Sequence, residues 1–204
     1  MYVCIEGVIG VGKTTLVRML SKKFGIRPIL EIVEENPFLA NFYVDRERWA
    51  FQTQLFFLLS RYSQQEELLK IVKKEDVVSD YMFDKDKLFA QMNLFGDQLS
   101  LYERVYGVLE SKVPTPDLIV YLKASVETLM ERISMRDRLF ERSISKNYIS
   151  NLVKAYDDFF SKCTNKFVTI DADKIDFVRN ERDFNLVISK IKKCGIDFGE
   201  GSIR

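Results

Sequence analysis

Residues 7–14 constrain the fold of this chain more than any other segment. They fill the pattern G-x-x-x-x-G-K-[ST] and follow the apolar run Tyr2–Ile5, which predicts a strand. In that setting the loop turns backbone N–H groups toward phosphate oxygens, and the helix that follows adds its positive end. The pattern therefore predicts an α/β fold with a nucleotide site, although a glycine-rich turn without a ligand would show the same letters.

Within this loop, Lys13 is placed to reach the outer phosphates of a nucleoside triphosphate, and the Thr14 hydroxyl is placed to bind Mg²⁺. We therefore expect ATP and Mg²⁺ as cofactors. The expected nucleotide contacts are Gly7, Val8, Ile9, Gly10, Val11, Gly12, Lys13, Thr14 and Thr15.

Strand and helix patterns alternate along the rest of the chain. Apolar runs predict strands at 2–5, 28–33, 77–80, 118–122 and 167–170. Helical patterns follow the loop and occupy 48–73, 99–109, the segments capped by Ser125 and Ser145, and 181–193. This order predicts one domain over residues 1–204, with a five-stranded parallel sheet and helices on both faces. Ligands should gather at the carboxyl ends of its strands.

Composition narrows the partners. The chain has 31 basic and 30 acidic residues, a net charge of +1, so no bulk field favours nucleic acid or a membrane surface. The three cysteines are scattered without metal-ligand spacing, and no leader or membrane-length apolar run is visible, so we expect a cytoplasmic protein with a small-molecule partner. Histidine is absent, so proton transfer must use another side chain.

Two acids fall near expected strand ends. Glu31 lies in the apolar run 29–33 and is suited to accept the proton of an attacking hydroxyl, whereas Glu34 and Glu35 fit a solvated turn equally well. Asp80 ends the third expected strand, where it could steady Mg²⁺ held by Thr14 or accept hydrogen bonds from a nearby loop.

Arginines cluster at Arg132, Arg136 and Arg138, ahead of a polar break. Phosphoryl transfer builds charge on the equatorial oxygens, and guanidinium groups on a closing loop stabilise it. We expect a lid over about residues 136–143; a solvated basic helix end is the alternative.

Together these segments resemble the deoxynucleoside kinase family, in particular its bacterial branch. The resemblance covers 2–186 and rests on the phosphate loop, on 31–38 (EIVEENPF), on 49–54 (WAFQTQ) with Ser60-Arg61, on Asp80 and on the arginine cluster. It implies a P-loop NTPase fold, transfer of the ATP γ-phosphoryl group to the 5′-hydroxyl of a deoxynucleoside, and a homodimer formed through the long helices.

The family's roles carry over to matching positions in this chain. The resemblance makes Glu31 the general base, places Tyr43 and Glu141 at the sugar 3′-hydroxyl, and sets Asp171 and Asp173 beside the adenine of ATP. Gln54 and Arg61 match the base-reading pair, with Asp86 or Asp84 as the acid that completes it.

A carboxylate accepts from an exocyclic amine and disfavours a carbonyl, so this trio predicts deoxyadenosine or deoxycytidine over thymidine.

Two positions depart from the family pattern. Ile32 replaces the proline that usually follows the catalytic acid, and Tyr81-Met82 replaces Arg-Ser after Asp80. The missing arginine normally helps to place the 5′-oxygen and the transferred phosphate, so its role here is lost or falls to Arg61, Arg132 or another residue.

Two other functions remain open. A thymidylate-type kinase shares the fold, but it would carry an arginine after Asp80, where this chain has Tyr81. A nucleotide-dependent regulatory protein would hydrolyse ATP slowly whether or not a nucleoside is present.

Overall fold

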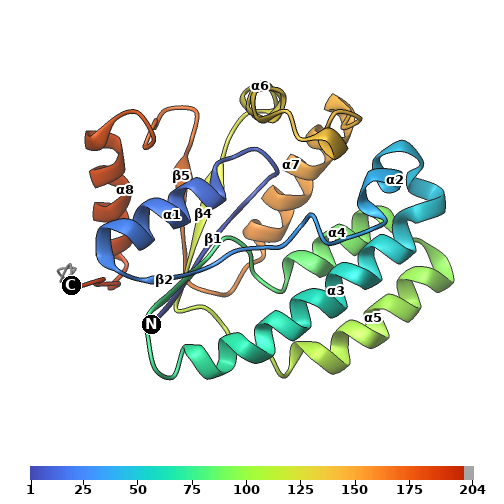
Figure 1. Ribbon diagram of the computed structural model, residues 1–204, viewed down its shortest axis with the longest axis horizontal. Coiled ribbons are helices and arrows are strands. Elements are labelled where there is room, and N and C mark those ends of the chain that lie inside the picture. The colour runs from blue at the N-terminus through green and yellow to red at the C-terminus, as the bar shows by residue number, and fades with distance from the viewer. Residues whose placement is uncertain (200–204) are drawn as a thin grey trace.

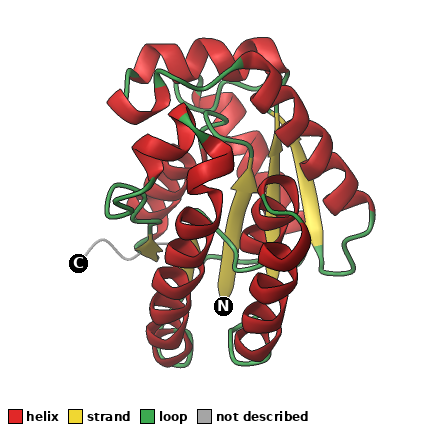
Figure 2. Ribbon diagram, turned by 90° about the vertical axis from the view of Figure 1, so that its right-hand side faces the viewer, coloured by secondary structure: helices red, strands yellow, loops and turns green. Residues whose placement is uncertain are grey.

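The centre of the sheet is β1 (Tyr2–Gly7), which is buried along its whole length. The computed structural model describes residues 1–199, and its strands lie in the order β2-β3-β1-β4-β5, all parallel. Their arrows point the same way in Figure 2. The remaining strands are β2 (Arg27–Ile29), β3 (Val77–Ser79), β4 (Leu118–Lys123) and β5 (Phe167–Asp171). The predicted five-stranded parallel sheet is confirmed.

Helices cover both faces of this sheet. In Figure 1, α1 and α8 lie on one side of the strands, and α3, α4, α5 and α7 lie on the other. Within residues 1–199, every helix is too short or too polar to span a lipid bilayer. The helices are α1 (Lys13–Phe24), α2 (Leu39–Val44), α3 (Arg46–Ile71), α4 (Lys85–Asn93), α5 (Gly96–Glu110), α6 (Val126–Arg136), α7 (Lys146–Ser161) and α8 (Glu181–Lys193).

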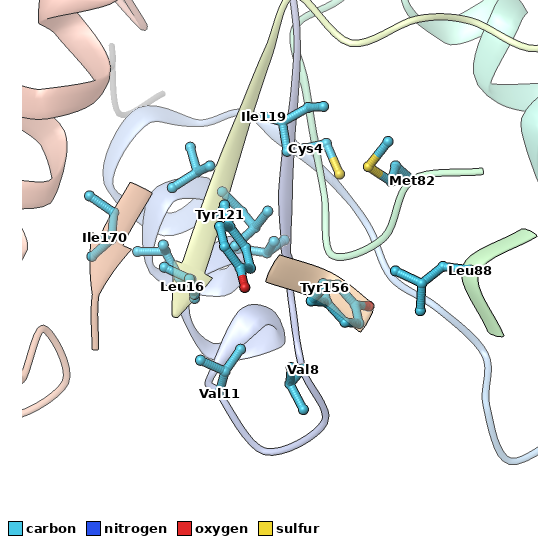
Figure 3. Packing of buried hydrophobic residues seen from close by; sticks show 14 of the residues in the cluster. Cys4, Val8, Val11, Leu16, Met82, Leu88, Ile119, Tyr121, Tyr156 and Ile170 are labelled. Atoms are coloured by element: carbon cyan, nitrogen blue, oxygen red, sulfur yellow. The ribbon is translucent and has the colours of Figure 1, made fainter. Parts of the chain in front are cut away.

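The core forms where the helices meet the strands. Figure 3 shows Leu16 of α1 close to the strands, and Tyr156 of α7 beside Tyr121 of β4. The rings of Tyr121 and Tyr156 are stacked with centroids 6.2 Å apart. This packing fixes the carboxyl edge of the sheet, where the loops after β1, β2 and β3 converge.

Capping agrees with the sequence. The Ser125 hydroxyl accepts from the Thr128 backbone N–H at the start of α6, and the Ser145 hydroxyl accepts from the Tyr148 N–H at the start of α7. Each serine therefore satisfies a donor that the first helical turn leaves free.

The second strand is shorter than predicted. It ends at Ile29, and Leu30–Val33 leaves the sheet as loop. The Glu31 N–H donates to the Asp80 carboxylate at 2.7 Å instead of joining a strand ladder. Glu31 therefore lies beyond the strand end, at the sheet edge, and not within a strand.

Candidate active site

The phosphate loop has the backbone geometry that its glycines allow. Gly10 and Gly12 have φ angles of +89° and +106°, a region that side chains with a Cβ rarely adopt. Lys13 Nζ donates to the carbonyl oxygens of Gly7 and Val8 at 2.7 and 3.2 Å. Burial, together with the nearby Lys85 ammonium, lowers the pKa of Lys13 to about 8.

Asp80 joins this loop to the segment after β2. One carboxylate oxygen accepts from the Thr14 hydroxyl at 2.5 Å, and the other accepts from the Glu31 N–H at 2.7 Å. Burial raises the pKa of Asp80, and these hydrogen bonds oppose the shift. Both sequence interpretations of Asp80 are therefore geometrically available, since it faces Thr14 and also holds a loop.

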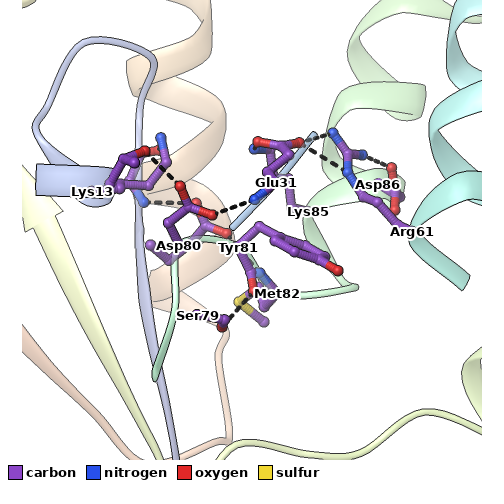
Figure 4. A network of polar contacts seen from close by, with 12 residues as sticks. Lys13, Glu31, Arg61, Ser79, Asp80, Tyr81, Met82, Lys85 and Asp86 are labelled. Atoms are coloured by element: carbon purple, nitrogen blue, oxygen red, sulfur yellow. Dashed lines mark hydrogen bonds and ion pairs between the residues drawn. The ribbon is translucent and has the colours of Figure 1, made fainter. Parts of the chain in front are cut away.

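Glu31 lies at the centre of a buried network (Figure 4). Its Oε1 accepts from Arg61 Nε at 2.9 Å and also from Arg61 Nη2, and its Oε2 accepts from Lys85 Nζ at 2.7 Å. Arg61 also pairs with Asp86 through Nη1. Burial favours the neutral acid, but the Arg61 and Lys85 charges outweigh burial and hold the pKa of Glu31 well below its usual range.

A cavity of about 220 Å³ opens beside Glu31. Residues from α2, α3, α4, the phosphate loop and the arginine-rich segment form its wall, so segments far apart in sequence meet there. Of the residues expected from sequence, its lining includes Ile9, Gly10, Lys13, Thr14, Glu31, Tyr43, Gln54, Asp80, Arg136, Arg138 and Glu141.

A second cavity, of about 570 Å³, lies on the other side of the phosphate loop. Residues 10–15, Arg132 and Arg136 line it, together with residues 175–179, which follow β5. Lys13, Thr14 and Arg136 line both cavities, so the two spaces meet at the outer end of the phosphate loop.

The expected place of Asp171 and Asp173 beside adenine stays a prediction. Neither lines the second cavity: Asp173 accepts from the N–H and hydroxyl of Ser125, and Asp171 pairs with Lys174 at 3.0 Å. Asp173 therefore holds the residue that caps α6, and Asp171 pairs within its own loop. The neighbouring segment 175–179 reaches the cavity in their place, and a Cβ built on Gly12 would approach Phe177 to 3.2 Å.

The three arginines occupy different positions. Arg132 donates to the carbonyl oxygens of Val11 and Ala172, which ties α6 to the phosphate loop. Arg136 pairs with the buried Glu141, with Nε 2.6 Å from Oε2. Arg138 lies 3.4 Å from Glu34 Oε1, on the far side of the smaller cavity. Arg136 and Arg138 therefore face that cavity, whereas Arg132 is anchored to backbone.

Of the three residues expected to read the base, one lines the smaller cavity and two are buried beside it. Gln54 lines the smaller cavity, while Arg61 and Asp86 are buried outside its lining. Within residues 1–199, Gln54 Oε1 and Asp86 Oδ2 are buried without a hydrogen-bond partner. Asp84 instead accepts from the Tyr106 hydroxyl at 3.0 Å and borders a separate cavity at the amino edge of the sheet. The geometry thus groups Asp86, and not Asp84, with Arg61.

Sequence reasoning missed Lys85 as a site residue. Lys85 lies between Asp84 and Asp86 in the chain, with Phe83 and Phe89 close by. The two phenylalanines were the signal of burial, and a buried ammonium requires a partner. That partner, Glu31, is 54 residues away along the chain and became visible only in the folded structure.

The donor set at Thr14 and Asp80 fits Mg²⁺. A hydroxyl and a carboxylate already in contact offer hard oxygen ligands, and Mg²⁺ usually takes one or two of these together with phosphates and water. Within the described residues, no group of three or more acidic, cysteine or histidine side chains forms an all-protein metal cage.

Comparison with known proteins agrees with this geometry. The family model for deoxynucleoside kinases matches residues 3–195. The chain is 39% identical to a deoxyguanosine kinase of Bacillus subtilis, covering 94% of this chain and 96% of the relative. It is 33% identical to a deoxyadenosine kinase of Dictyostelium discoideum, covering 89% and 75%.

Solved structures agree as well. A deoxyadenosine kinase from M. mycoides with bound dATP superposes with a TM-score of 0.82 at 28% identity, covering 94% of this chain and all of that one. These matches extend over nearly the whole sequence and include both cavities. The chain therefore belongs to the deoxynucleoside kinase family, whose members are ATP-binding phosphotransferases.

Proposed function

We propose that this kinase phosphorylates the 5′-hydroxyl of a deoxynucleoside held in the smaller cavity, with ATP in the larger one and Mg²⁺ at Thr14 and Asp80. The observation that carries the proposal is the position of Glu31. Its carboxylate lines the smaller cavity beside Lys13 and Thr14, which also line the larger one.

In the proposed step, Glu31 takes the proton of the 5′-hydroxyl as the 5′-oxygen bonds to the γ-phosphorus. The bond from that phosphorus to the β–γ bridging oxygen breaks, and ADP leaves with the electron pair. Lys13 and Arg136 border both cavities and supply positive charge where the transferred group gathers negative charge. Tyr43 and Glu141 hold the sugar at its 3′-hydroxyl.

For the base, we infer a ring that bears an exocyclic amine. The unpartnered Gln54 oxygen lines this cavity and would accept from the amine, whereas thymine places a carbonyl there. The unpartnered Asp86 oxygen is buried outside the lining and would accept from a donor that reaches past it. Deoxyadenosine and deoxycytidine are the substrates expected from the sequence. Deoxyguanosine carries its amine at another ring position and has a carbonyl where adenine has its amine. It is a second candidate because the relative at 39% identity is a deoxyguanosine kinase.

The test is phosphorylation of the four deoxynucleosides by ATP, with monophosphate measured directly. We expect kcat/KM for thymidine to be the lowest, because a polar site rejects a mismatched base by leaving buried groups unpaired, at about 1–3 kcal/mol per group. Asp86→Asn should reduce the difference in kcat/KM between thymidine and the preferred deoxynucleosides. Asp84→Asn should leave the ranking of the four deoxynucleosides unchanged. Thymidine as the best substrate, or an unchanged ranking in Asp86→Asn, would overturn the base assignment.

Glu31→Gln tests the general base in the same assay. It keeps the shape of the side chain and removes its basicity, so kcat should fall by about 10²-fold or more with little change in acceptor KM. Near-normal turnover in Glu31→Gln, with loss of turnover in Glu34→Gln, would move the role to Glu34.

A further inference from the structure

Lys85 occupies a position that local rules disfavour. It is the first residue of α4 and is only 7% exposed, so its ammonium is both buried and next to the positive end of a helix. Such violations are expected at functional sites, where a residue is kept for its chemistry. The surroundings of the ammonium show what that chemistry is.

Lys85 Nζ donates to Glu31 Oε2 at 2.7 Å, and this is its one hydrogen bond to residues 1–199. An ammonium has three donors, so two remain for a ligand. Lys85 lines the smaller cavity together with Lys13, Glu31 and Asp80. Its two free N–H groups therefore face the cavity in which Glu31 would accept the proton, and a ligand bound there can accept from them.

Two cations facing one space indicate an anion between them. Burial and then the charge of Lys85 lower the pKa of Lys13, and the carboxylates of Glu6, Glu31 and Asp80 oppose this shift. A phosphoryl group between Lys13 and Lys85 would remove this repulsion. Glu31 offsets only part of this repulsion, because the pKa of Lys13 stays lowered and one oxygen of Glu31 already pairs with Arg61.

Two arginines that could supply this charge, Arg61 and Arg132, already have partners. Arg61 uses Nε and Nη2 on Glu31 and Nη1 on Asp86, and Arg132 is bound to backbone carbonyls. Tyr81, at the position where the family pattern has an arginine, donates its hydroxyl to Gln64 Oε1 at 2.6 Å and is buried. Tyr81 therefore points toward α3 and contributes no charge to the cavity.

We propose that Lys85 is a catalytic residue: its ammonium orients the Glu31 carboxylate and donates to the 5′-oxygen and the γ-phosphoryl group during transfer. This inference rests on the proposed function, because it requires the acceptor hydroxyl to lie beside Glu31. Lys85, at the start of α4, would then provide the positive charge that the arginine of the family pattern provides and that Tyr81 does not.

The experiment compares Lys85→Met, Lys85→Gln and Lys85→Arg in the kinase assay, with binding of ATP and deoxynucleoside measured by calorimetry. Lys87→Met is the matched control, because Lys87 is on the same helix but is exposed and borders the cavity at the amino edge. We expect Lys85→Met to lower kcat by about 10²-fold with deoxynucleoside affinity changed by less than about threefold. Lys85→Arg should recover at least about tenfold of that loss, and Lys87→Met should match the wild type.

The pH profile separates this role from a packing role. Without the neighbouring ammonium, Glu31 binds a proton more readily, so the acidic limb of kcat/KM should move to higher pH in Lys85→Met and Lys85→Gln. If Lys85→Met does not fold, Lys85→Gln keeps a donor to Glu31 without the charge and gives the same readout. If Lys85 only filled space, its replacement would leave the acidic limb of kcat/KM at the wild-type pH.

Wild-type turnover in Lys85→Met or in Lys85→Gln would overturn the inference, as would equal losses in Lys85→Arg and Lys85→Met. A wild-type enzyme that forms no monophosphate from any deoxynucleoside would instead contradict the proposed function.

Discussion

Among individual residues, Glu31 shows how burial and charge compete. Its side chain is 10% exposed, and it remains ionised because Arg61 and Lys85 contact both of its oxygens. Removing one member of a buried ion pair leaves the others uncompensated, which costs about 3–5 kcal/mol. The same charges that keep Glu31 ionised therefore also stabilise the loop after β2.

This arrangement predicts a pH-dependent stability. The folded-state pKa of Glu31 is lowered, so the unfolded chain takes up this proton first as the pH falls. The stabilisation from Glu31 is thus fully present above its unfolded pKa of about 4.3 and is lost below it. Glu31→Gln should lower the free energy of unfolding by about 3 kcal/mol at pH 7, and the difference from wild type should shrink between about pH 5 and pH 3.

Urea unfolding at a series of pH values measures this difference. Glu35→Gln is the control, because Glu35 is exposed in the same loop and should show no such trend. A Glu31→Gln difference that stays constant down to pH 3 would contradict the pairing.

At the scale of elements, the arginine-rich segment connects two parts of the site. α6 ends at Arg136, and Asp137 takes a left-handed conformation with φ of 43°, so the chain reverses into a 3₁₀ turn at Leu139–Glu141. The turn buries Glu141 beside Arg136, while Arg138 reaches Glu34 in the loop after β2. Closure of this segment would bring both arginines against the transferred phosphoryl group.

We therefore expect Arg136→Ala and Arg138→Ala to lower kcat by about 10²-fold while ATP affinity changes by less than about threefold, because these groups meet charge that grows in the transition state. Arg142→Ala is the matched control, since Arg142 is exposed and pairs with Asp137 at 2.7 Å. Rapid-quench turnover and ATP calorimetry provide the two quantities. ATP binding that weakens as much as kcat falls would indicate a ground-state contact instead of a lid.

At the scale of the whole molecule, the helices farthest from α8 expose apolar side chains. Leu101 and Val108 lie two turns apart on α5 and are 47% and 62% exposed, and Leu59 of α3 is 54% exposed. We propose that a second copy of the chain covers these residues, in the homodimer through the long helices that the family resemblance implies.

Sedimentation should therefore give twice the 23.9 kDa mass of one chain. Leu101→Glu with Val108→Glu should shift the protein to monomer, because the charges would be buried without partners. Leu186→Glu is the control on α8, where the leucine is 45% exposed on the other side of the sheet. A wild-type protein that sediments as a monomer would refute the homodimer.

Sequence patterns anticipated much of the architecture because they are local. The phosphate loop requires a strand before it and a helix after it, and Ser125 and Ser145 cap helices within three residues of themselves. Strand and helix periods then leave few ways to form a parallel sheet. The short α2 and α4 were not predicted, because packing against α3 contributes more to their formation than their own periodicity does.

Local patterns in the chain specify the nucleotide loop, the five parallel strands, the family, and the acids and arginines from which the site is drawn. Tertiary structure decided how they are used. It ended β2 before Glu31, grouped Asp86 with Arg61, held Asp173 against Ser125, and brought Lys85 against Glu31. The physical reason is range: turns and caps depend on neighbours in the chain, whereas the pairing of buried charges depends on which segments the fold brings together.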